Sequence, residues 1–544
     1  MKKAANPFQR VLLDFDNTCN QITSCGRDSE EVETIEMIED AVRRFGERHV
    51  DDAQIDAQAD IPSDLLAKMA EMGLFGLTIA KEYGGAGMSM KGACRVCDCL
   101  AQVDRSVGVT VGLHAGLGLR GLNYFGSDEL KKRYLPDLAT GKLIAAFSIT
   151  EPDAGSDIAS VRTTGTEDGD HLVINGSKCF VTNGSFAGIS TIVARTPGLA
   201  GSRRGHSMIL VPLDLPGIQR DAEEHKLGIK GSSTCSVHFE DVRIPKSHIL
   251  GRPSRGLDHM NYVLSWGRTL MAGGCIGLAT SAFKRTIEQV TNRRQFNRPI
   301  GEFGMVREMV ALMRARLFAM ESTIRLTTRL EDEQPESIIW ESSVAKIFNS
   351  ESAWQITDDA LQLHGGSGFI EETGVARLLR DCRITRIFEG ANELLRFHMA
   401  SAAFTWKPEP ILESPGLEPL LDDPLKECGR SFDPLLRKLA ESLRTKKKAH
   451  GLKIFQRQMD QRRIADVAVS LYVILSLVVR AQGELRAGKL TDEMLLWTRL
   501  GVFDLARRAD EDLRALDENL DEVASRIAAT ECERAGCPLK EKNS

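Results

Sequence analysis

The sequence contains no long run of uncharged apolar residues and no recognisable secretory signal. Its longest apolar stretch, residues 467–479, is shorter than the roughly 20 residues that a membrane-spanning helix requires. Near the N-terminus, Asp14 and Asp16 interrupt the only apolar patch, which excludes the hydrophobic core of a signal peptide. We therefore expect a chain that neither spans a membrane nor enters the secretory pathway.

An excess of positive charge and a regular cysteine pattern are also missing. The net charge of -6 and the pI of about 6.1 argue against a general nucleic-acid-binding protein. The 12 cysteines are scattered, so we expect free thiols in a reducing compartment, the cytoplasm. Cys94 and Cys97 form a lone CxxC beside Cys99, and no second pair follows at zinc spacing. This pattern predicts small buried thiols and no metal site.

The composition is that of an ordinary soluble globular protein, with 42% hydrophobic and 27% charged residues among 544. This length predicts about three or four domains. The hydrophobic period changes from helical to strand-like near residue 144 and back to helical near residue 257, and a proline-rich linker covers residues 408–424. We predict an N-terminal extension (1–30), a helical domain (31–143), a β domain (144–252), a second helical domain (253–405) and an additional helical domain (425–540).

The β domain is predicted from short strand-like runs at residues 145–150, 171–175, 178–182, 208–211 and 235–239. The dipeptides Asn175-Gly176 and Asn183-Gly184 are typical of tight turns between strands. Short strands with tight turns and no intervening helices favour an antiparallel sheet or barrel.

Two short motifs are interpreted as chance matches. Gly116, Gly118 and Gly121 satisfy GxGxxG, but the flanking segments have helical rather than strand periodicity, so we expect these glycines to allow close helix packing. Asp14, Asp16 and Thr18 satisfy the DxDxT motif of haloacid-dehalogenase-like phosphatases, without the alternating strands and helices that such a site needs.

The segment 444–463 is strongly basic, with eight Lys or Arg residues against one Asp, and it precedes the apolar stretch 464–479. Two interpretations remain open. The first is a solvated basic helix face, and the second is peripheral docking on the inner face of an anionic membrane.

Glu389 is the candidate catalytic residue, a carboxylate between Phe388 and Gly390 just before a helical run at 394–404. Apolar neighbours raise the pKa of a carboxyl group by desolvation, and a helix N-terminus favours its anion. These opposed effects suit a general base, although a glutamate near a helix start is more often a cap or a surface charge.

Five motifs, in this order and spacing, change that assessment. They are Phe147–Asp157 (FSITEPDAGSD), Lys178–Gly184 (KCFVTNG), Arg293–Phe296 (RRQF), Gln362–Phe369 (QLHGGSGF) and Phe388–Gly390 (FEG). With them, the sequence resembles the acyl-CoA dehydrogenase family over residues 31–404. The C-terminal helices resemble the extra domain of the very-long-chain branch and of its complex I assembly paralogue.

The resemblance implies an α+β multidomain fold. Its parts are an N-terminal all-α domain, a middle antiparallel β-barrel or sandwich, a C-terminal four-helix bundle and an additional C-terminal α-helical domain. It also implies FAD as cofactor, an acyl-CoA substrate, an electron-transfer flavoprotein as electron acceptor, and a homodimer that binds no nucleic acid.

Site residues are implied by position. Glu389 matches the base that removes the α-proton, and Arg268 matches an arginine that supports it. The residues that match FAD-binding positions are Phe147, Ile149, Thr150, Gly155, Ser156, Phe180, Thr182, Arg293, Phe296, Gln362, Leu363, Gly365, Gly366, Ala391 and Glu393. No metal ligand is implied.

Four positions depart from the family pattern. Phe180 replaces a tryptophan beside the flavin, Ala391 replaces a threonine, Gly304 replaces a glutamine, and Gly267 leaves an alternative base position empty. Glu389 is then the one candidate base. The predicted reaction is dehydrogenation of an acyl-CoA, with long chains favoured, to a trans-2-enoyl-CoA in fatty acid β-oxidation. The alternatives are an acyl-CoA oxidase and a flavoprotein that acts as an assembly or interaction partner.

Overall fold

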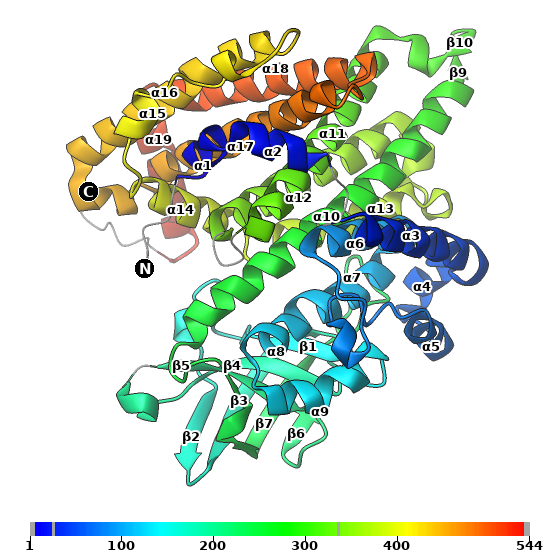
Figure 1. The fold of residues 1–544 in the computed structure, drawn as a ribbon, viewed down its shortest axis with the longest axis vertical. Coiled ribbons are helices and arrows are strands. Elements are labelled where there is room, and N and C mark those ends of the chain that lie inside the picture. The colour runs from blue at the N-terminus through cyan, green and yellow to red at the C-terminus, as the bar shows by residue number, and fades with distance from the viewer. Residues whose placement is uncertain (1–5, 24–27, 204, 334–337, 538–544) are drawn as a thin grey trace. The chain divides into compact units, whose positions relative to one another are not determined.

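The computed structural model describes residues 6–23, 28–203, 205–333 and 338–537. The chain divides into two compact units, whose helices and strands are labelled in Figure 1. Unit 2 contains residues 14–395 and 476–501, whereas unit 1 contains residues 1–13, 396–475 and 502–544. Each unit is described by itself.

The N-terminal part of unit 2 is helical, as the sequence predicts. Side chains accept hydrogen bonds at several helix starts, for example Ser89 Oγ from the N–H of Gly92 and Asp104 Oδ1 from the N–H of Val107. The apolar faces bury a core that includes Ile35, Val42 and Leu100. The elements are α2 (Phe15–Ile22), α3 (Ser29–His49), α4 (Asp52–Gln58), α5 (Ser63–Glu71), α6 (Met90–Val103), α7 (Arg105–Leu113), α8 (Leu119–Phe125) and α9 (Asp128–Ala139).

The glycines of the GxGxxG match lie in helical backbone as predicted. The predicted close helix packing holds for Gly116, which faces Leu270, whereas Gly118 and Gly121 pack against the sheet. A π-helical turn, His114–Gly118, joins α7 to α8. A Cβ at Gly118 would lie 2.8 Å from the Cβ of Ala145, so only glycine allows this approach to the sheet. His114 Nδ1 accepts the N–H of Ala145 at 2.9 Å, and Nε2 lies 3.0 Å from the carbonyl of Phe75.

The β domain is an eight-stranded, largely antiparallel sheet with the order β6-β7-β3-β2-β4-β5-β8. β1 pairs with β4 in parallel. The predicted turn at Asn175-Gly176 is wrong, because β3 continues through this dipeptide with a register irregularity. The strands are β1 (Ala145–Ser148), β2 (Thr164–Asp168), β3 (His171–Thr182), β4 (Ile189–Arg195), β5 (His206–Pro212), β6 (Ile218–Arg220), β7 (Thr234–Pro245) and β8 (Ile249–Leu250).

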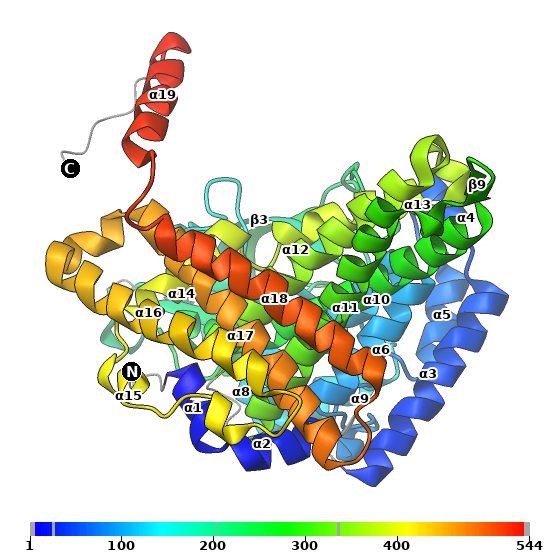
Figure 2. The same ribbon diagram turned by 90° about the horizontal axis from the view of Figure 1, so that it is seen from above.

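Long helices follow the sheet, and α10, α11 and α12 pack side by side (Figure 2). α10 is buried on most faces between residues 260 and 279, where glycine and alanine allow close contact with α6 and α12. The elements are α10 (Gly256–Asn292), the hairpin β9 (Arg294–Gln295) and β10 (Arg298–Pro299), α11 (Gly304–Glu333), α12 (Ile339–His364), α13 (Val375–Arg383) and α14 (Asn392–Ala403).

Unit 1 combines the N-terminal helix with helices from the C-terminal region. The ring of Phe8 lies 6.0 Å from that of Trp406 and 6.4 Å from that of Phe432.

The DxDxT residues, at the start of unit 2, do not follow a strand, because Asp14 precedes α2 and Thr18 lies within it. The helices of unit 1 are α1 (Pro7–Leu13), α15 (Glu409–Leu412), α16 (Lys426–His450) and α19 (Asp521–Arg534). α17 (Gln458–Arg486) belongs to unit 1 up to residue 475, and α18 (Asp492–Arg514) belongs to it from residue 502.

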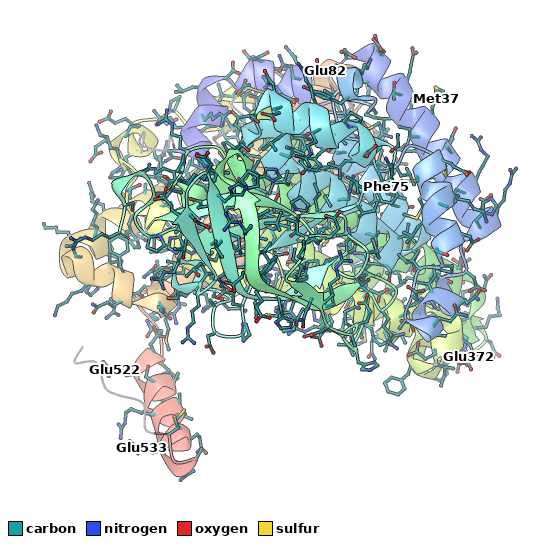
Figure 3. The ribbon with its side chains drawn as sticks, turned by 90° about the horizontal axis from the view of Figure 1, so that it is seen from below. Met37, Phe75, Glu82, Glu372, Glu522 and Glu533 are labelled. Carbon is teal, nitrogen blue, oxygen red and sulfur yellow. The ribbon has the colours of Figure 1, made fainter. Side chains whose placement is uncertain are left out.

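α17 is more apolar than the sequence analysis judged. Among the described residues it is the one helix long and apolar enough to cross a membrane, but 94% of its most apolar window is buried inside the structure. A core helix of a soluble protein has this property. By contrast, α19, which carries Glu522 and Glu533, has no buried residue (Figure 3).

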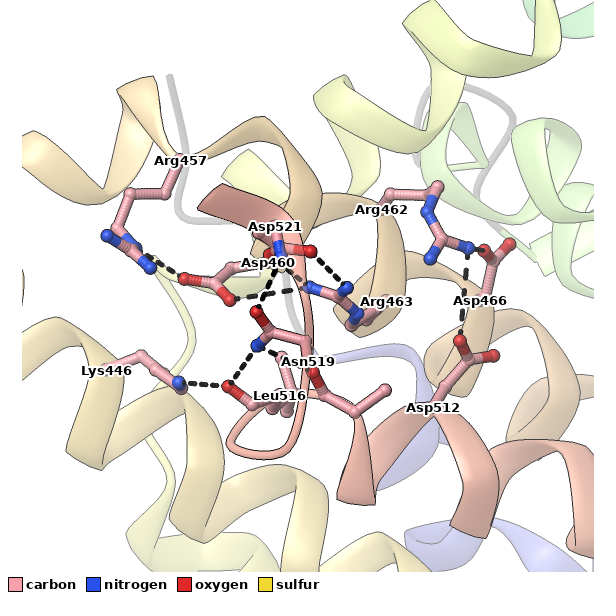
Figure 4. A network of polar contacts seen from close by, with 11 residues as sticks. Lys446, Arg457, Asp460, Arg462, Arg463, Asp466, Asp512, Leu516, Asn519 and Asp521 are labelled. Carbon is pink, nitrogen blue, oxygen red and sulfur yellow. Dashed lines mark hydrogen bonds and ion pairs between the residues drawn. The ribbon is translucent and has the colours of Figure 1, made fainter. Parts of the chain in front are cut away.

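The basic segment 444–463 is largely paired within unit 1 (Figure 4). Lys446 donates to the carbonyl of Leu516 at 2.7 Å and lies 3.1 Å from Asp517. Arg463 forms a bidentate pair with Asp521 at 2.6 and 2.7 Å. Much of the positive charge is therefore neutralised inside the unit.

Candidate active site

Glu389 lies in a strained loop between α13 and α14. Its φ angle is 57° and that of Gly390 is 100°, so two consecutive residues adopt positive φ. This conformation is uncommon for a residue with a side chain, costs about 1–3 kcal/mol, and persists only where the surroundings impose it.

Two buried cations hold the carbonyl oxygens of this loop. Arg268 on α10 donates from Nε to the carbonyl of Glu389 at 3.1 Å. Lys346 on α12 donates from Nζ to the carbonyl of Gly390 at 2.9 Å and to Oδ1 of Asn392 at 2.6 Å. Both cations bond to the backbone or to an amide, so the Glu389 carboxyl group remains available.

The Glu389 carboxyl group is buried and incompletely bonded. Its Oε2 atom is sealed from solvent and accepts no hydrogen bond from the described residues. Burial raises the pKa of Glu389 to about 7, against the opposing influence of Arg268, Lys346 and Arg105. The rise that the sequence analysis expected from apolar neighbours is therefore confirmed in direction.

Gly267 makes room for the carboxyl group. A Cβ at this position would lie 2.9 Å from Glu389 Oε2 and 2.3 Å from Leu117 Cδ2. The absence of a side chain at Gly267 thus leaves the position without a base and also permits Glu389 to occupy the space beside α10.

The backbone N–H of Glu389 is available as a hydrogen-bond donor. Within the part of the chain that the structure describes, it donates no backbone hydrogen bond, whereas the N–H groups of Ile387 and Phe388 both bond to the carbonyl of Ile384. An unbonded N–H beside a base can stabilise negative charge that develops on a substrate oxygen.

The predicted flavin-ring residues come together on β1 and β3. Phe147 lies in β1, and Ile149 and Thr150 continue this strand toward a turn. The carbonyl of Thr150 accepts the N–H of Cys179 at 2.9 Å, which brings the end of β1 next to β3. Thr182 ends β3. The end of β1 and the C-terminal part of β3, which are separated in the sequence, are therefore neighbours.

Phe180 stands on an irregularity of β3. The pairing of β3 with β7 shifts between Lys178 and Val181, and Phe180 has a φ of 56°. Its ring is 65% exposed. A large aromatic ring held in solvent by strained backbone suits contact with a planar ligand.

A buried ion pair fixes the turn that follows Thr150. Lys178 Nζ lies 2.7 Å from Glu151 Oε1 and also donates to the carbonyls of Ile149 and Val193. Glu151 accepts further hydrogen bonds from Arg162 and Thr163. Although burial raises the pKa of Glu151, these hydrogen bonds outweigh it and hold the pKa below its usual value.

Gly155 and Ser156 lie on the exposed side of this turn. A Cβ at Gly155 would meet no heavy atom within 4 Å, so open space faces the backbone here. An exposed turn with accessible N–H groups is able to bind an anionic group such as a pyrophosphate.

A second set of predicted FAD-binding residues lies far from the first. α10 has 37 residues and is therefore about 55 Å long. It begins near the sheet and ends at Asn292, so Arg293 lies between the helix and the β9–β10 hairpin (Figure 1). Phe296 in this hairpin is 88% exposed. Gln362, Gly365 and Gly366 are exposed near the end of α12, where Leu363 is buried. Ala391 and Glu393 flank Asn392 beside the Glu389 loop.

The roles of Lys346, Lys178 and Glu151 were not predicted from the sequence. Lys346 interrupts the apolar run Val344–Phe348 on a buried helix face, and this position is a recognisable signal for a buried lysine with polar partners. The described cysteines are unpaired, and Cys94, Cys97 and Cys99 are buried as expected. No cluster of three or more metal-ligating side chains occurs in the described ranges.

This combination of a three-part α–β–α fold, a strained loop with a buried carboxyl group, and an exposed aromatic ring on the sheet agrees with comparisons to known proteins. Family models for the N-terminal, middle and C-terminal domains of acyl-CoA dehydrogenases match residues 32–142, 146–242 and 254–404. The chain belongs to the acyl-CoA dehydrogenase family, whose members are flavin-dependent oxidoreductases.

Individual relatives define the similarity further. The chain is 31% identical over 530 residues to the human mitochondrial very long-chain specific acyl-CoA dehydrogenase, covering 90% of this chain and 81% of the human protein. The crystal structure of a Bacillus anthracis acyl-CoA dehydrogenase complexed with FAD has a TM-score of 0.79 and 27% identity, covering 92% of this chain and 91% of the other. Butyryl-CoA dehydrogenase from Megasphaera elsdenii has a TM-score of 0.65 and 28% identity, covering 68% of this chain and 97% of the other.

Proposed function

We propose that this protein catalyses the FAD-dependent α,β-dehydrogenation of a long-chain acyl-CoA to a trans-2-enoyl-CoA in fatty acid β-oxidation, with Glu389 as the base. The observation that carries this proposal is the Glu389 carboxyl group, which is buried and accepts no hydrogen bond at Oε2. Its pKa, raised by burial to about 7, suits proton transfer near neutral pH.

The residues present fit FAD. The exposed ring of Phe180, the end of β1 at Ile149 and Thr150, and the open turn at Gly155 and Ser156 together offer an aromatic face, polar groups and turn amides. In this proposal Phe180, Ile149 and Thr150 hold the flavin ring system, and the turn at Gly155 and Ser156 holds the pyrophosphate. When bound, FAD would supply the acceptor for the hydride that leaves the substrate β-carbon.

Glu389 removes the α-proton of the thioester as the β-hydride leaves, and its carboxylate becomes a neutral carboxyl group. The negative charge that develops on the thioester oxygen is stabilised by the N–H of Glu389, which has no partner among the described residues. Arg268 fixes this N–H and the side chain by bonding to the carbonyl of the same residue. The burial of the carboxyl group excludes water from the proton transfer.

The proposed homodimer follows from the two separated sets of FAD-binding residues. In this proposal, Arg293 and Phe296, beyond the C-terminal end of α10, and Gln362 and Gly366, near the C-terminal end of α12, do not reach a flavin at β1 of the same chain. Exposed apolar side chains accompany them, with Phe296 88% and Phe369 78% exposed. In a dimer these residues would bind the adenine half of the partner's FAD, and Leu363 and Gly365 would support that surface.

The long-chain preference and the electron acceptor are proposed from the relatives. The human relative is named for very long chains, and it matches this chain through the C-terminal helices. The proposed acceptor is an electron-transfer flavoprotein, as membership of the acyl-CoA dehydrogenase family implies.

Peripheral membrane contact through residues 444–463 is also retained as a proposal. Leu452 is 85% exposed in this segment, and it lies between Lys448 and Lys453. Lys446 and Lys447 donate to backbone carbonyls of unit 1, so Lys448 and Lys453 are the better probes. If Lys448→Glu with Lys453→Glu leaves co-sedimentation with anionic vesicles unchanged, the basic face is merely solvated.

The proposed function is tested with the purified flavoprotein and palmitoyl-CoA under anaerobic conditions. We expect a flavin absorption band that bleaches when the substrate is added. Glu389→Gln should reduce the rate of bleaching about 10³-fold, whereas Glu372→Gln, a change at an exposed glutamate (Figure 3), should not. Normal bleaching by Glu389→Gln would refute the assignment of the base.

The same preparation separates the two rival functions. Stoichiometric oxygen consumption with peroxide formation would identify an acyl-CoA oxidase. A stable flavin band that no acyl-CoA bleaches would favour an assembly or interaction protein.

A further inference from the structure

Lys346 is an unusual residue for its surroundings. It lies on α12, its side chain is fully buried, and its nearest sequence neighbours are apolar. A buried ammonium group is costly unless it is hydrogen-bonded. Lys346 meets this requirement at the loop that carries Glu389 (residues 389–392, the base loop). It donates hydrogen bonds to the carbonyl of Gly390 and to the side chain of Asn392.

The partners of Lys346 are themselves fixed. Asn392 is fully buried at the start of α14 and donates to Ser350 at 3.0 Å and to Glu351 at 2.9 Å. Ser350 and Glu351 lie on α12, one turn after Lys346. The hydrogen bonds therefore tie the loop after Glu389, at Gly390 and Asn392, to one rigid helix.

These hydrogen bonds hold the loop at its strained residues, Glu389 and Gly390. Positive φ angles at Glu389 and Gly390 determine where the carboxyl group and the N–H of Glu389 point. Arg268 holds the first carbonyl and Lys346 holds the second. Loss of either donor would leave a buried carbonyl without its partner and would allow the loop to relax.

We propose that Lys346 is a positioning residue for the base, which holds the strained loop through Gly390 and Asn392 and places a positive charge beside the Glu389 carboxylate. This inference rests on the proposed function of Glu389 and adds a residue to it. Lys346 touches neither substrate nor cofactor in this role and acts through the loop and its electric field.

The charges around the pair are few. Burial lowers the pKa of Lys346, and Glu389 opposes this effect. A lysine and a glutamate that face each other in a buried site each favour the charged form of the other. The titratable or charged groups that act on the pair are Arg268 and Cys275 from α10, Arg105 from α7, Cys97 from α6 and Glu351 from α12.

The first test is the pH dependence of kcat/KM in the FAD-loaded enzyme. Lys346→Met removes the charge and the donors, so the acidic limb that reports Glu389 should move upward by about one pH unit. Lys346→Gln keeps a donor without the charge and should show a similar pH shift with a smaller loss of rate. Lys91→Met is the matched control, because Lys91 is a buried lysine that pairs with Asp332 at 3.8 Å and not with the base loop. It should leave the pH profile unchanged.

The second test does not depend on turnover. The free energy of unfolding is measured against pH for the wild-type protein and for Glu389→Gln. The raised pKa of Glu389 makes the wild-type protein lose stability as pH rises from 4.5 to about 7. The difference between the two proteins therefore reports the pKa of Glu389. With Lys346→Met in both chains, this loss should extend to higher pH.

The outcomes are distinguishable. If Lys346→Met and Lys346→Gln move neither the acidic limb nor the window of the stability difference, Lys346 is only structural and the inference is wrong. If Glu389→Gln retains full turnover, the proposed function fails, but the stability difference still reports whether Lys346 acts on Glu389.

Discussion

Unit 2 contains two buried arrangements of a lysine and a glutamate, and they differ in how the carboxyl group is bonded. Glu151 accepts hydrogen bonds from Lys178, Thr163 and Arg162. Glu389 has a buried Oε2 with no hydrogen bond from the described residues, although Lys346 is close enough to influence its pKa. The same two residue types thus produce opposite effects, a pKa held below the usual value for Glu151 and a raised pKa for Glu389.

The difference in hydrogen bonding distinguishes a structural ion pair, Lys178 with Glu151, from a reactive carboxyl group, Glu389. A fully bonded ion pair makes a rigid scaffold, and it is costly to disturb because each partner would leave a buried charge. A buried carboxyl group with few hydrogen bonds costs stability but remains able to take a proton. In this protein the rigid pair fixes the proposed flavin turn, and the poorly bonded group is the proposed base.

The largest expected effect is on the rigid pair. Lys178→Met leaves Glu151 buried without its ammonium partner, and we expect the free energy of unfolding to fall by about 3–5 kcal/mol. Chemical denaturation of the protein at neutral pH measures this fall. The double variant Lys178→Met with Glu151→Gln should lose less than the single variant. An additive loss would mean that the pair is not coupled.

Glu389→Gln should increase the free energy of unfolding at neutral pH, whereas Lys178→Met decreases it. Because the folded-state pKa of Glu389 is about 7 and the ordinary value is 4.5, its contribution to stability is present below pH 4.5 and is lost as pH rises to about 7. Relative to wild type, Glu389→Gln should therefore gain about 3 kcal/mol over this range. Urea denaturation at pH 5 and pH 8 measures the difference. A gain that is equal at both values would contradict the raised pKa.

The space beside the base can be tested separately. Gly267→Ala places a Cβ 2.9 Å from Glu389 Oε2 and 2.3 Å from Leu117. We expect kcat to fall about 100-fold, because a displacement of the base near 1 Å suffices for such a loss. Gly304→Ala is the matched control, since a Cβ at Gly304 meets no heavy atom within 4 Å. Unchanged kcat in Gly267→Ala would show that the carboxyl group is free to move.

The smallest effect concerns Phe180. Its ring is 65% exposed, so Phe180→Ala should leave the unfolding of the FAD-free protein unchanged within about 0.5 kcal/mol. We expect the affinity for FAD to weaken by about 1 kcal/mol through the loss of an aromatic contact. Fluorescence titration of the FAD-free protein measures the change. Equal affinity would place the ring outside the cofactor site.

The sequence predicted the order of helical and β regions because hydrophobic periodicity is a local property. It placed the change to strands at residue 144, and β1 begins at Ala145. It divided β3 at Asn175-Gly176, because a dipeptide typical of hairpin turns is also compatible with an irregularity inside a strand. The pairing of β3 with β7, which depends on residues about 60 positions apart, decides between the two.

The candidate site was only partly predictable for the same reason. Glu389 and Arg268 were recognisable from the family pattern, and the raised pKa of Glu389 followed from its apolar neighbours. The bonds from Lys346 to Gly390 and Asn392 join residues more than 40 positions apart, and no local pattern encodes them. A lysine inside an apolar helical run was the available signal, and it was not used.

The packing of α1 has a consequence for the order in which the chain can fold. Phe8 and Val11 are fully buried, and the ring of Phe8 meets those of Trp406 and Phe432. During synthesis these early residues must wait for a partner made some 400 residues later. A chain that starts at residue 14 would leave the rings of Trp406 and Phe432 without the Phe8 ring that packs against them.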